Sequence, residues 1–165
     1  MMIHAPFLIS VILCILLPQD DAFVRAVNLA KPYNITVVAV NTPELWATQA
    51  LVIENQLLIN VQRFRWAVVN QAHARSLNWS STDCPDHIII HEISHFLLYR
   101  KIGRDAYDRL NRPVALGYDH VSTIIGNYAA TCEGEFTAEV FTGLQTGIIY
   151  PDDIMKHYLE LWNGH

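Results

Sequence analysis

Charged residues are scarce in this chain of 165 residues, in which Asp, Glu, Lys and Arg together account for 16%. The eleven Lys and Arg are scattered, so the sequence lacks the basic clustering that marks a nucleic-acid-binding surface. Internal repeats and low-complexity tracts are also absent. The hydrophobic content of 52% is too high for a disordered chain, and the length suits one domain with a hydrophobic core.

An uncharged apolar run, APFLISVILCILLP from Ala5 to Pro18, is shorter than a membrane span requires, so no stable span is expected. Its length suits the core of a signal peptide, although no Lys or Arg precedes it and no small-x-small cleavage pattern follows. Residues 1–22 are therefore interpreted in two ways. They form a signal peptide of a secreted protein, or a buried apolar segment of a cytoplasmic one. In both cases the domain proper is expected over residues 23–165.

Cysteine is rare, with three in the chain. Cys14 lies in the apolar run and would be removed with a signal peptide. Cys84 and Cys132 would remain, and each lies just before a segment that we assign to the candidate site. A disulfide between them could form in an oxidising compartment, and two buried thiols are the alternative.

Short β-branched stretches predict strands in the first half of the chain. Residues 34–41 (NITVVAVN) predict one strand, and residues 50–61 (ALVIENQLLINV) predict two short strands on either side of Asn55-Gln56. Apolar residues then recur at nearly helical spacing over 62–77, where we expect a helix.

The second half of the chain predicts helices. One should run from about 86 to 102 and end at Gly103, and a second should cover 132–147. Pro151 is expected to open a last helix, whereas residues 103–127 suggest loops or short helices. Because strands come first and helices follow, the predicted fold class is α+β.

The sequence HEISH lies within the helix predicted over 86–102. His91 and His95 are four residues apart, so they are neighbours on one helix face and can bind one zinc ion. Glu92 projects about 100° around the helix from His91, where it can accept a proton from a water molecule activated by the metal. HExxH is the metallopeptidase signature with this mechanism. The alternative is a helix whose histidines make ordinary hydrogen bonds.

A catalytic zinc ion usually takes three protein ligands, and four downstream residues could supply the third. These are His120, Glu133, Glu135 and Glu139. Glu135 and Glu139 lie one helical turn apart, so Glu135 can bind zinc while Glu139 holds a ligand histidine through its ring N–H. Glu133 points nearly the opposite way and is expected in solvent. His120 would instead give an all-histidine site, and His87 is expected on the helix face without being a ligand.

These motifs resemble the gluzincin zinc metallopeptidases, and within them the catalytic domain of anthrax toxin lethal factor and related proteins. The resemblance covers the HEISH helix and about twenty residues that include Tyr128 and the segment CEGEFTAEVF (132–141). Tyr128 precedes Glu135 by seven residues, as the corresponding tyrosine does in that family. The resemblance implies a zincin-like fold, in which a small mixed sheet packs on the HExxH helix and further helices follow.

The resemblance implies a zinc-dependent metalloendopeptidase with one catalytic Zn²⁺. It implies that His91, His95 and Glu135 hold the ion and that Glu92 is the general base. Lethal factor has further domains that recognise its carrier and its substrate, and 165 residues have no room for them. The substrate is therefore expected to be a protein or peptide whose identity does not follow from the resemblance.

Tyr128 is implied to donate a hydrogen bond to the oxyanion, a role that stabilises the transition state selectively. A buried tyrosine with a satisfied hydroxyl is the alternative. The resemblance also implies that LLINV (57–61) is the sheet edge along which a substrate adds as a strand. Two other functions stay open: a catalytically silent zincin-like module that binds or regulates, and a structural domain without metal.

Overall fold

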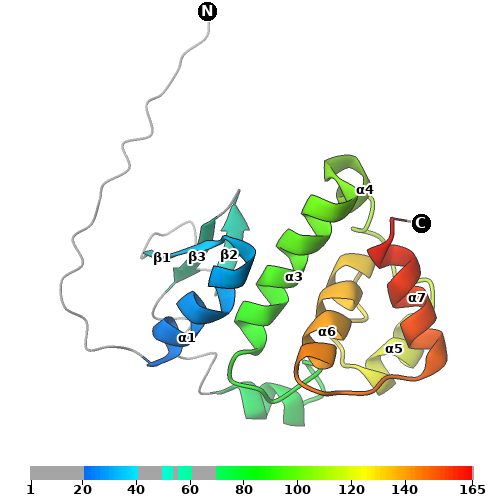
Figure 1. Cartoon of the computed structure of the whole chain (residues 1–165). Coiled ribbons are helices and arrows are strands. Elements are labelled where there is room, and N and C mark those ends of the chain that lie inside the picture. The colour runs from blue at the N-terminus through cyan, green and yellow to red at the C-terminus, as the bar shows by residue number, and fades with distance from the viewer. Residues whose placement is uncertain (1–20, 41–49, 54–55, 61–69, 165) are drawn as a thin grey trace, which may run out of the picture.

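The computed structural model describes residues 21–40, 50–53, 56–60 and 70–164 (Figure 1). In chain order the elements are α1 (Asp21–Ala30), the 3-10 helix η1 (Lys31–Tyr33), β1 (Thr36–Val40), β2 (Ala50–Ile53), β3 (Gln56–Asn60), α3 (His87–Ile102), α4 (Arg104–Asp108), α5 (Tyr118–Ile124), α6 (Glu133–Gln145) and α7 (Asp152–Trp162). The fold class is α+β, as predicted, with the strands before most of the helices. Across these ranges, no helix is long and apolar enough to cross a membrane.

Some predicted segments lie outside the described residues. They are residues 1–20, which contain the apolar run, residues 41, 54–55 and 61 of the predicted strand segments, and residues 62–69 of the helix predicted over 62–77. In the described part of that helix, residues 70–77, residues 70–76 are helical and residue 77 is in a turn. The division into residues 1–22 and 23–165 therefore stays a prediction.

The sheet is mixed, with strand order β1-β3-β2. β3 pairs in parallel with β1 and antiparallel with β2, so the two strands predicted within 50–61 are confirmed, and they are neighbours in the sheet. The expectation that 57–61 forms a sheet edge is wrong for its described part. β3 lies between two strands, and its backbone hydrogen-bonding groups are used on both sides.

Helix α3 lies at the centre of the fold, with α1 and the sheet on one side and α6 and α7 on the other (Figure 1). On the sheet side, Ile89 and Ile93 pack with Leu57 and Ile59 of β3. On the other side, Leu98 joins the larger hydrophobic cluster that α5, α6 and α7 build. Because both sides of α3 are covered, its buried polar side chains, which are His87, His91 and Ser94, must find their partners inside the protein.

The predicted boundaries of the later helices agree with the structure to within two residues. α3 ends before Gly103, whose φ of 81° is favourable for glycine and whose N–H donates to the carbonyl of Tyr99. α6 begins directly after Cys132, and Pro151 is the residue before α7. Residues 103–127 contain the short helices α4 and α5, as expected.

Gly143 of α6 should be intolerant of substitution, because the ring of Tyr150 packs directly against its backbone. A Cβ atom at position 143 would lie 2.7 Å from Cζ and 2.9 Å from Cε2 of Tyr150 and would overlap with the hydroxyl. Gly143→Ala should therefore lower the free energy of unfolding by about 1–3 kcal/mol, measured by denaturant titration.

Gly134 is the matched control in the same helix. A Cβ atom there meets nothing closer than 3.8 Å, so Gly134→Ala should be neutral or stabilising by up to about 1 kcal/mol. Equal stability of the two alanine variants would contradict the packing described for Gly143 and Tyr150.

Candidate metal centre

Two helices bring three potential metal ligands together: His91 and His95 from α3, and Glu135 from the first turn of α6. Nε2 of His91 lies 2.9 Å from Oε2 of Glu135 and 3.0 Å from Nε2 of His95. Nε2 of His95 lies 3.4 Å from the same oxygen of Glu135. Ligand atoms about 2.0–2.1 Å from a tetrahedral zinc ion are about 3.3–3.4 Å apart. The triangle is therefore close to the size that the ion requires.

The second nitrogen of each ring contacts another side chain. Nδ1 of His91 lies 2.9 Å from Oε1 of Glu139, and Nδ1 of His95 lies 2.9 Å from the hydroxyl of Tyr107. Both carboxylates only accept hydrogen bonds, so a protonated His91 donates to Glu139 through Nδ1 and to Glu135 through Nε2. If the ring is neutral and keeps its proton on Nδ1, the lone pair of Nε2 faces the carboxylate of Glu135. A lone pair and a carboxylate that face each other need a cation between them. Two imidazoles and a carboxylate form a donor set that suits zinc.

The electrostatics of the cluster also favour positive charge at its centre. Burial lowers the pKa of His91, but hydrogen bonds with the carboxylates of Glu135 and Glu139 outweigh this effect and raise the pKa to about 10. Burial raises the pKa of Glu135, yet hydrogen bonds with His91 and His95 hold it below its usual range. Glu135 is therefore ionised, and a metal ion bound here would displace the proton that His91 otherwise holds.

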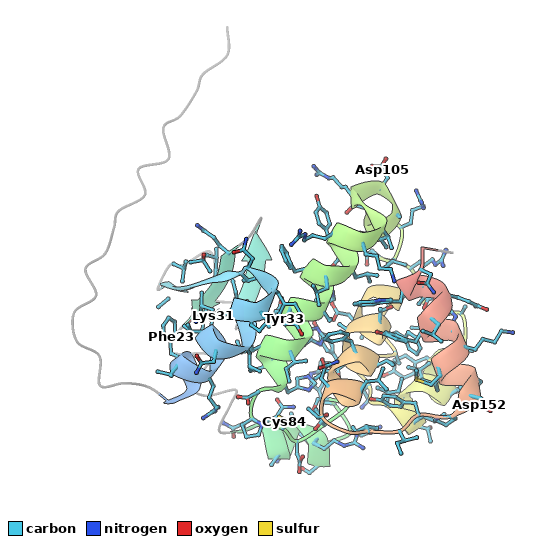
Figure 2. All side chains as sticks on the ribbon, viewed as in Figure 1. Phe23, Lys31, Tyr33, Cys84, Asp105 and Asp152 are labelled. Atoms are coloured by element: carbon cyan, nitrogen blue, oxygen red, sulfur yellow. The ribbon has the colours of Figure 1, made fainter. Side chains whose placement is uncertain are left out.

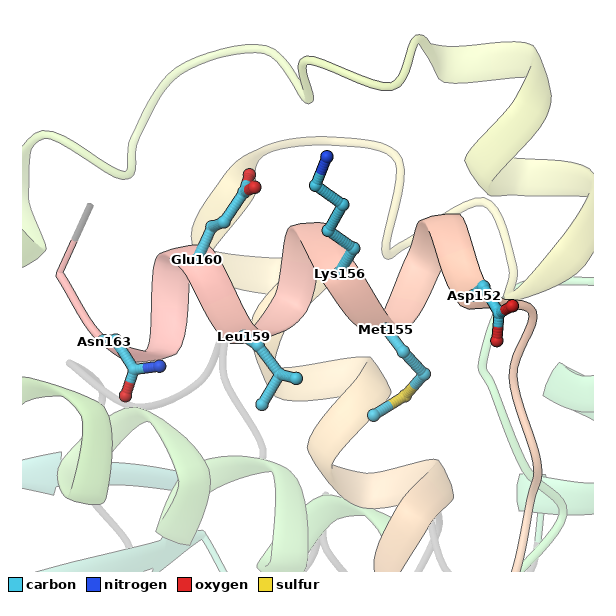
Figure 3. A pocket seen from close by; sticks show the side chains of 6 residues that line it. All are labelled: Asp152, Met155, Lys156, Leu159, Glu160 and Asn163. Atoms are coloured by element: carbon cyan, nitrogen blue, oxygen red, sulfur yellow. The ribbon is translucent and has the colours of Figure 1, made fainter.

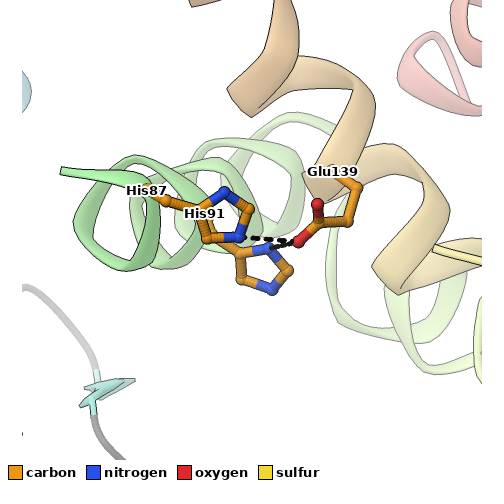
Figure 4. A group of neighbouring side chains, drawn as sticks. All are labelled: His87, His91 and Glu139. Carbon is orange, nitrogen blue, oxygen red and sulfur yellow. Dashed lines mark hydrogen bonds and ion pairs between the residues drawn. The ribbon is translucent and has the colours of Figure 1, made fainter. Parts of the chain in front are cut away.

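Glu139 is fully buried, and its carboxylate accepts three hydrogen bonds. Oε1 lies 2.9 Å from both Nδ1 of His91 and Nε2 of His87, and Oε2 accepts from the backbone N–H of Ser81 at 2.7 Å. Figure 4 shows His87 and His91 reaching from α3 to Glu139 on α6. Burial raises the pKa of Glu139, but the two histidines hold it below its usual range.

His87, His91 and Glu139 also place ligand-type atoms within 4.8 Å of one another, so this buried group could hold a metal ion as well. The spacing of Glu135 and Glu139 predicts that Glu139 contacts a candidate ligand histidine, and in the structure that histidine is His91. The part played by His87 was missed, although its position one turn before His91 was a signal. The contact of Ser81 has no sequence signal, because it is made by the backbone.

Glu92 is partly buried beside the cluster and is not one of the grouped ligand residues. Burial raises the pKa of Glu92, while the nearby His91 and His95 act in the opposite direction. A carboxyl group whose pKa is raised toward neutrality can accept a proton and release it again.

Two tyrosines lie beside the histidines. The ring of Tyr128 stacks on His91 on one side and on Trp79 on the other, with centroids 5.5 Å apart in both pairs. Burial, reinforced by the carboxylates of Glu135 and Glu92, raises the pKa of Tyr128, so its hydroxyl stays protonated and can donate. The second tyrosine, Tyr107 of α4, contacts His95. The contact of Tyr107 was not predicted, because Tyr107 lies in residues 103–127, where the sequence suggests only loops or short helices.

Two other residues that the sequence offered as a third ligand lie away from His91, His95 and Glu135. His120 is exposed on α5, and its Nε2 lies 2.6 Å from Oδ2 of Asp153 on α7. It therefore does not provide the third ligand in the described structure. The expectation that Glu133 lies in solvent is wrong, because its carboxylate is fully buried and accepts from His157 at 2.8 Å and from the backbone N–H of Ala115 at 3.1 Å. Helix α7 covers that face of α6.

A cavity of about 380 Å³ borders the candidate centre. His95 and Glu135 line it together with Tyr107, Asn111 and Cys132, so small molecules can reach two of the three candidate ligands. Another hollow, of about 470 Å³, lies on α7 (Figure 3). Its lining side chains come from α7 and the residue after it and include none of the candidate ligands, so we assign no site to it.

Cys84 and Cys132 are free cysteines in this structure, and both are half-buried. Cys84 lies in the loop before α3 (Figure 2), and Cys132 is the residue before α6. Of the two alternatives, the structure therefore has the thiols and not the disulfide.

Comparisons with known proteins give no match: no family model, no curated protein and no solved structure is similar to this chain.

Proposed function

We propose that this chain is a zinc-dependent metalloendopeptidase of the gluzincin type, with a zincin-like fold. The observation that carries the proposal is the convergence of Nε2 of His91, Nε2 of His95 and Oε2 of Glu135 within 3.4 Å of one another. The same three residues are those that the resemblance to lethal-factor-like proteases implies.

A catalytic ion belongs at this triangle and not at the group around Glu139, because a catalytic zinc needs one open coordination position. The side chain of Glu135 is 23% exposed, and Glu135 and His95 border the cavity. In contrast, the side chain of His87 is 7% exposed and that of Glu139 is 0% exposed. A peptide can therefore approach only the first group.

Zinc bound here would polarise a peptide carbonyl and lower the pKa of a water molecule. Glu92 would accept the proton of the attacking water and transfer it to the leaving amine. Tyr128 would donate a hydrogen bond to the carbonyl oxygen as negative charge develops on it. Glu139 and Tyr107 would hold the two ligand rings in orientation.

Metal titration combined with a hydrolysis assay tests the proposal. Protein freed of metal and titrated with Zn²⁺ should bind one ion per chain and cleave an unfolded protein such as casein. A chelator should abolish cleavage, and added zinc should restore it. Absence of zinc binding, or cleavage that a chelator does not affect, would contradict the proposal. Zinc binding without cleavage of any tested peptide would favour a silent binding module.

Tyr128→Phe should lower kcat by about 10²- to 10³-fold and leave zinc content unchanged, because it removes one donor to the developing oxyanion. Steady-state kinetics at saturating zinc measure this effect. Tyr107→Phe is the contrasting variant, since the Tyr107 hydroxyl contacts His95. It should weaken zinc binding more than it lowers kcat. An unchanged kcat for Tyr128→Phe would remove the assignment of Tyr128.

A further inference from the structure

We propose that His87 is a positioning residue of the metal centre, whose Nε2–H holds the carboxylate of Glu139 against His91 and so fixes the orientation of that ligand ring. The inference deepens the proposed function and rests on it, because it takes Nε2 of His91 as a metal ligand. It assigns the buried group of His87, His91 and Glu139 to hydrogen bonding and not to a second metal ion.

One carboxylate oxygen ties the two histidines together. Oε1 of Glu139 lies 2.9 Å from Nε2 of His87 and 2.9 Å from Nδ1 of His91, and the two rings are stacked with centroids 5.8 Å apart (Figure 4). Oε2 is held by the backbone N–H of Ser81. Glu139 is therefore immobilised by three donors in a place without solvent, and each donor restricts how its carboxylate can turn.

The ring of His87 acts as a donor through one nitrogen. Its Nδ1 has no hydrogen-bond partner among the residues that the structure describes, and the residue is only 5% exposed. An N–H without a partner is costly in such a place, so the proton of the neutral ring belongs on Nε2, where Glu139 accepts it.

The same geometry disfavours a second cation in this group. A metal ion shared by His87, His91 and Glu139 would need Nδ1 of His91 without its proton. His91 would then use both nitrogens as ligands whenever Nε2 also binds zinc, which requires a doubly deprotonated ring. If Nδ1 of His91 keeps its proton and donates it in a hydrogen bond to Glu139, the ring of His91 is neutral. Its Nε2 then has a free lone pair that can bind the ion.

Loss of the His87 donor should therefore weaken zinc binding through Glu139. Substitution of a residue that orients a metal-ligating histidine typically lowers metal affinity by about 10- to 100-fold. His87 acts one contact further away, so we expect an increase of about tenfold in the Kd for Zn²⁺ for His87→Leu.

Three variants of His87 separate its hydrogen bond from its bulk. His87→Leu removes the donor, His87→Gln places an amide N–H at the reach of Nε2, and His87→Asn has an amide too short to reach Oε1. Zn²⁺ affinity is measured by competition with a chromophoric chelator, and the geometry of the centre by the absorption spectrum of the Co²⁺-substituted protein. Leu and Asn should weaken Zn²⁺ binding about tenfold and change the Co²⁺ spectrum, and Gln should restore both.

His157 offers a matched control. Its Nε2 lies 2.8 Å from Oε2 of Glu133, another fully buried carboxylate of α6, but Glu133 contacts none of the three ligands in the described structure. His157→Leu should lower the thermal stability of the metal-free protein and leave Zn²⁺ affinity and the Co²⁺ spectrum as in the unaltered protein.

The inference is overturned if His87→Leu binds Zn²⁺ as tightly as the unaltered protein. Should the leucine variant not fold, equal Zn²⁺ affinities of the Asn and Gln variants overturn it instead. It is also overturned if the unaltered protein binds two Zn²⁺ ions and His87→Leu binds one. An unaltered protein that binds no Zn²⁺ contradicts the proposed function itself, which distinguishes the two failures.

Discussion

Replacing Glu92 by glutamine should lower peptide hydrolysis by about two to four orders of magnitude and leave one zinc ion bound per chain. Glu92 follows His91 on α3, but its carboxyl group does not belong to either group of ligand-type atoms. Glutamine has nearly the same size and cannot accept a proton, so the substitution removes proton transfer without changing the ligands. The measurements are kcat/KM with a peptide substrate and the zinc content of the purified variant.

Glu160→Gln is the control for Glu92→Gln, because the side chain of Glu160 is 50% exposed on α7 and lies outside the candidate centre. Its hydrolysis rate should equal that of the unaltered protein. If Glu92→Gln also retained full activity, Glu92 would not be the general base. Loss of zinc together with activity would instead indicate that Glu92 supports the ligands.

Glu135→Gln should raise the Kd for Zn²⁺ by more than about 100-fold. Substitution of residues that only hold a ligand in place already lowers metal affinity by about 10- to 100-fold, and loss of a ligand itself should cost more. An amide oxygen is a weaker ligand than a carboxylate and does not balance the charge of the ion. The pKa of Glu135 is held below its usual range by His91 and His95, so the ligand lost is an ionised one. Competition with a chromophoric chelator measures the affinity, and hydrolysis should be lost in parallel.

Glu133→Gln is the control for Glu135→Gln, because it removes the charge of another carboxylate in the same turn of α6. Glu133 is two residues before Glu135, on the opposite face of α6, where it contacts His157 and Ala115. Its substitution should lower thermal stability and leave zinc affinity unchanged. Equal losses of zinc affinity in the two variants would count against Glu135 as the third ligand.

Local patterns predicted much of the helical structure. The apolar stretch before Gly103 predicted α3 to within one residue, because a helix and its end depend on neighbouring residues. The four-residue spacing of His91 and His95 likewise placed both rings on one face. Glu135 and Glu139 were predicted to act on one centre for the same reason. His91 lies between them, with one carboxylate at each ring nitrogen.

Predictions that depended on contacts between distant segments were less successful. Glu133 was expected in solvent because it points away from Glu135, but α7 packs on that side of α6 and buries it. β3 was expected at a sheet edge, but β1 pairs with it in parallel across a gap in the sequence. Neither neighbour follows from local spacing, because packing partners are set by the burial of whole apolar faces.

By itself, the sequence determined which residues could act as ligands and base, and which of them share a helix face, because helical geometry relates residues only three or four positions apart. Only the tertiary structure decided which helix faces which. It placed Glu135, and not His120, beside His91 and His95, brought Tyr107 to His95, and enclosed His87 with Glu139. The physical reason is that α3 is covered on both sides, so the buried histidines His87 and His91 find their hydrogen-bond partners on α6, the helix that packs there.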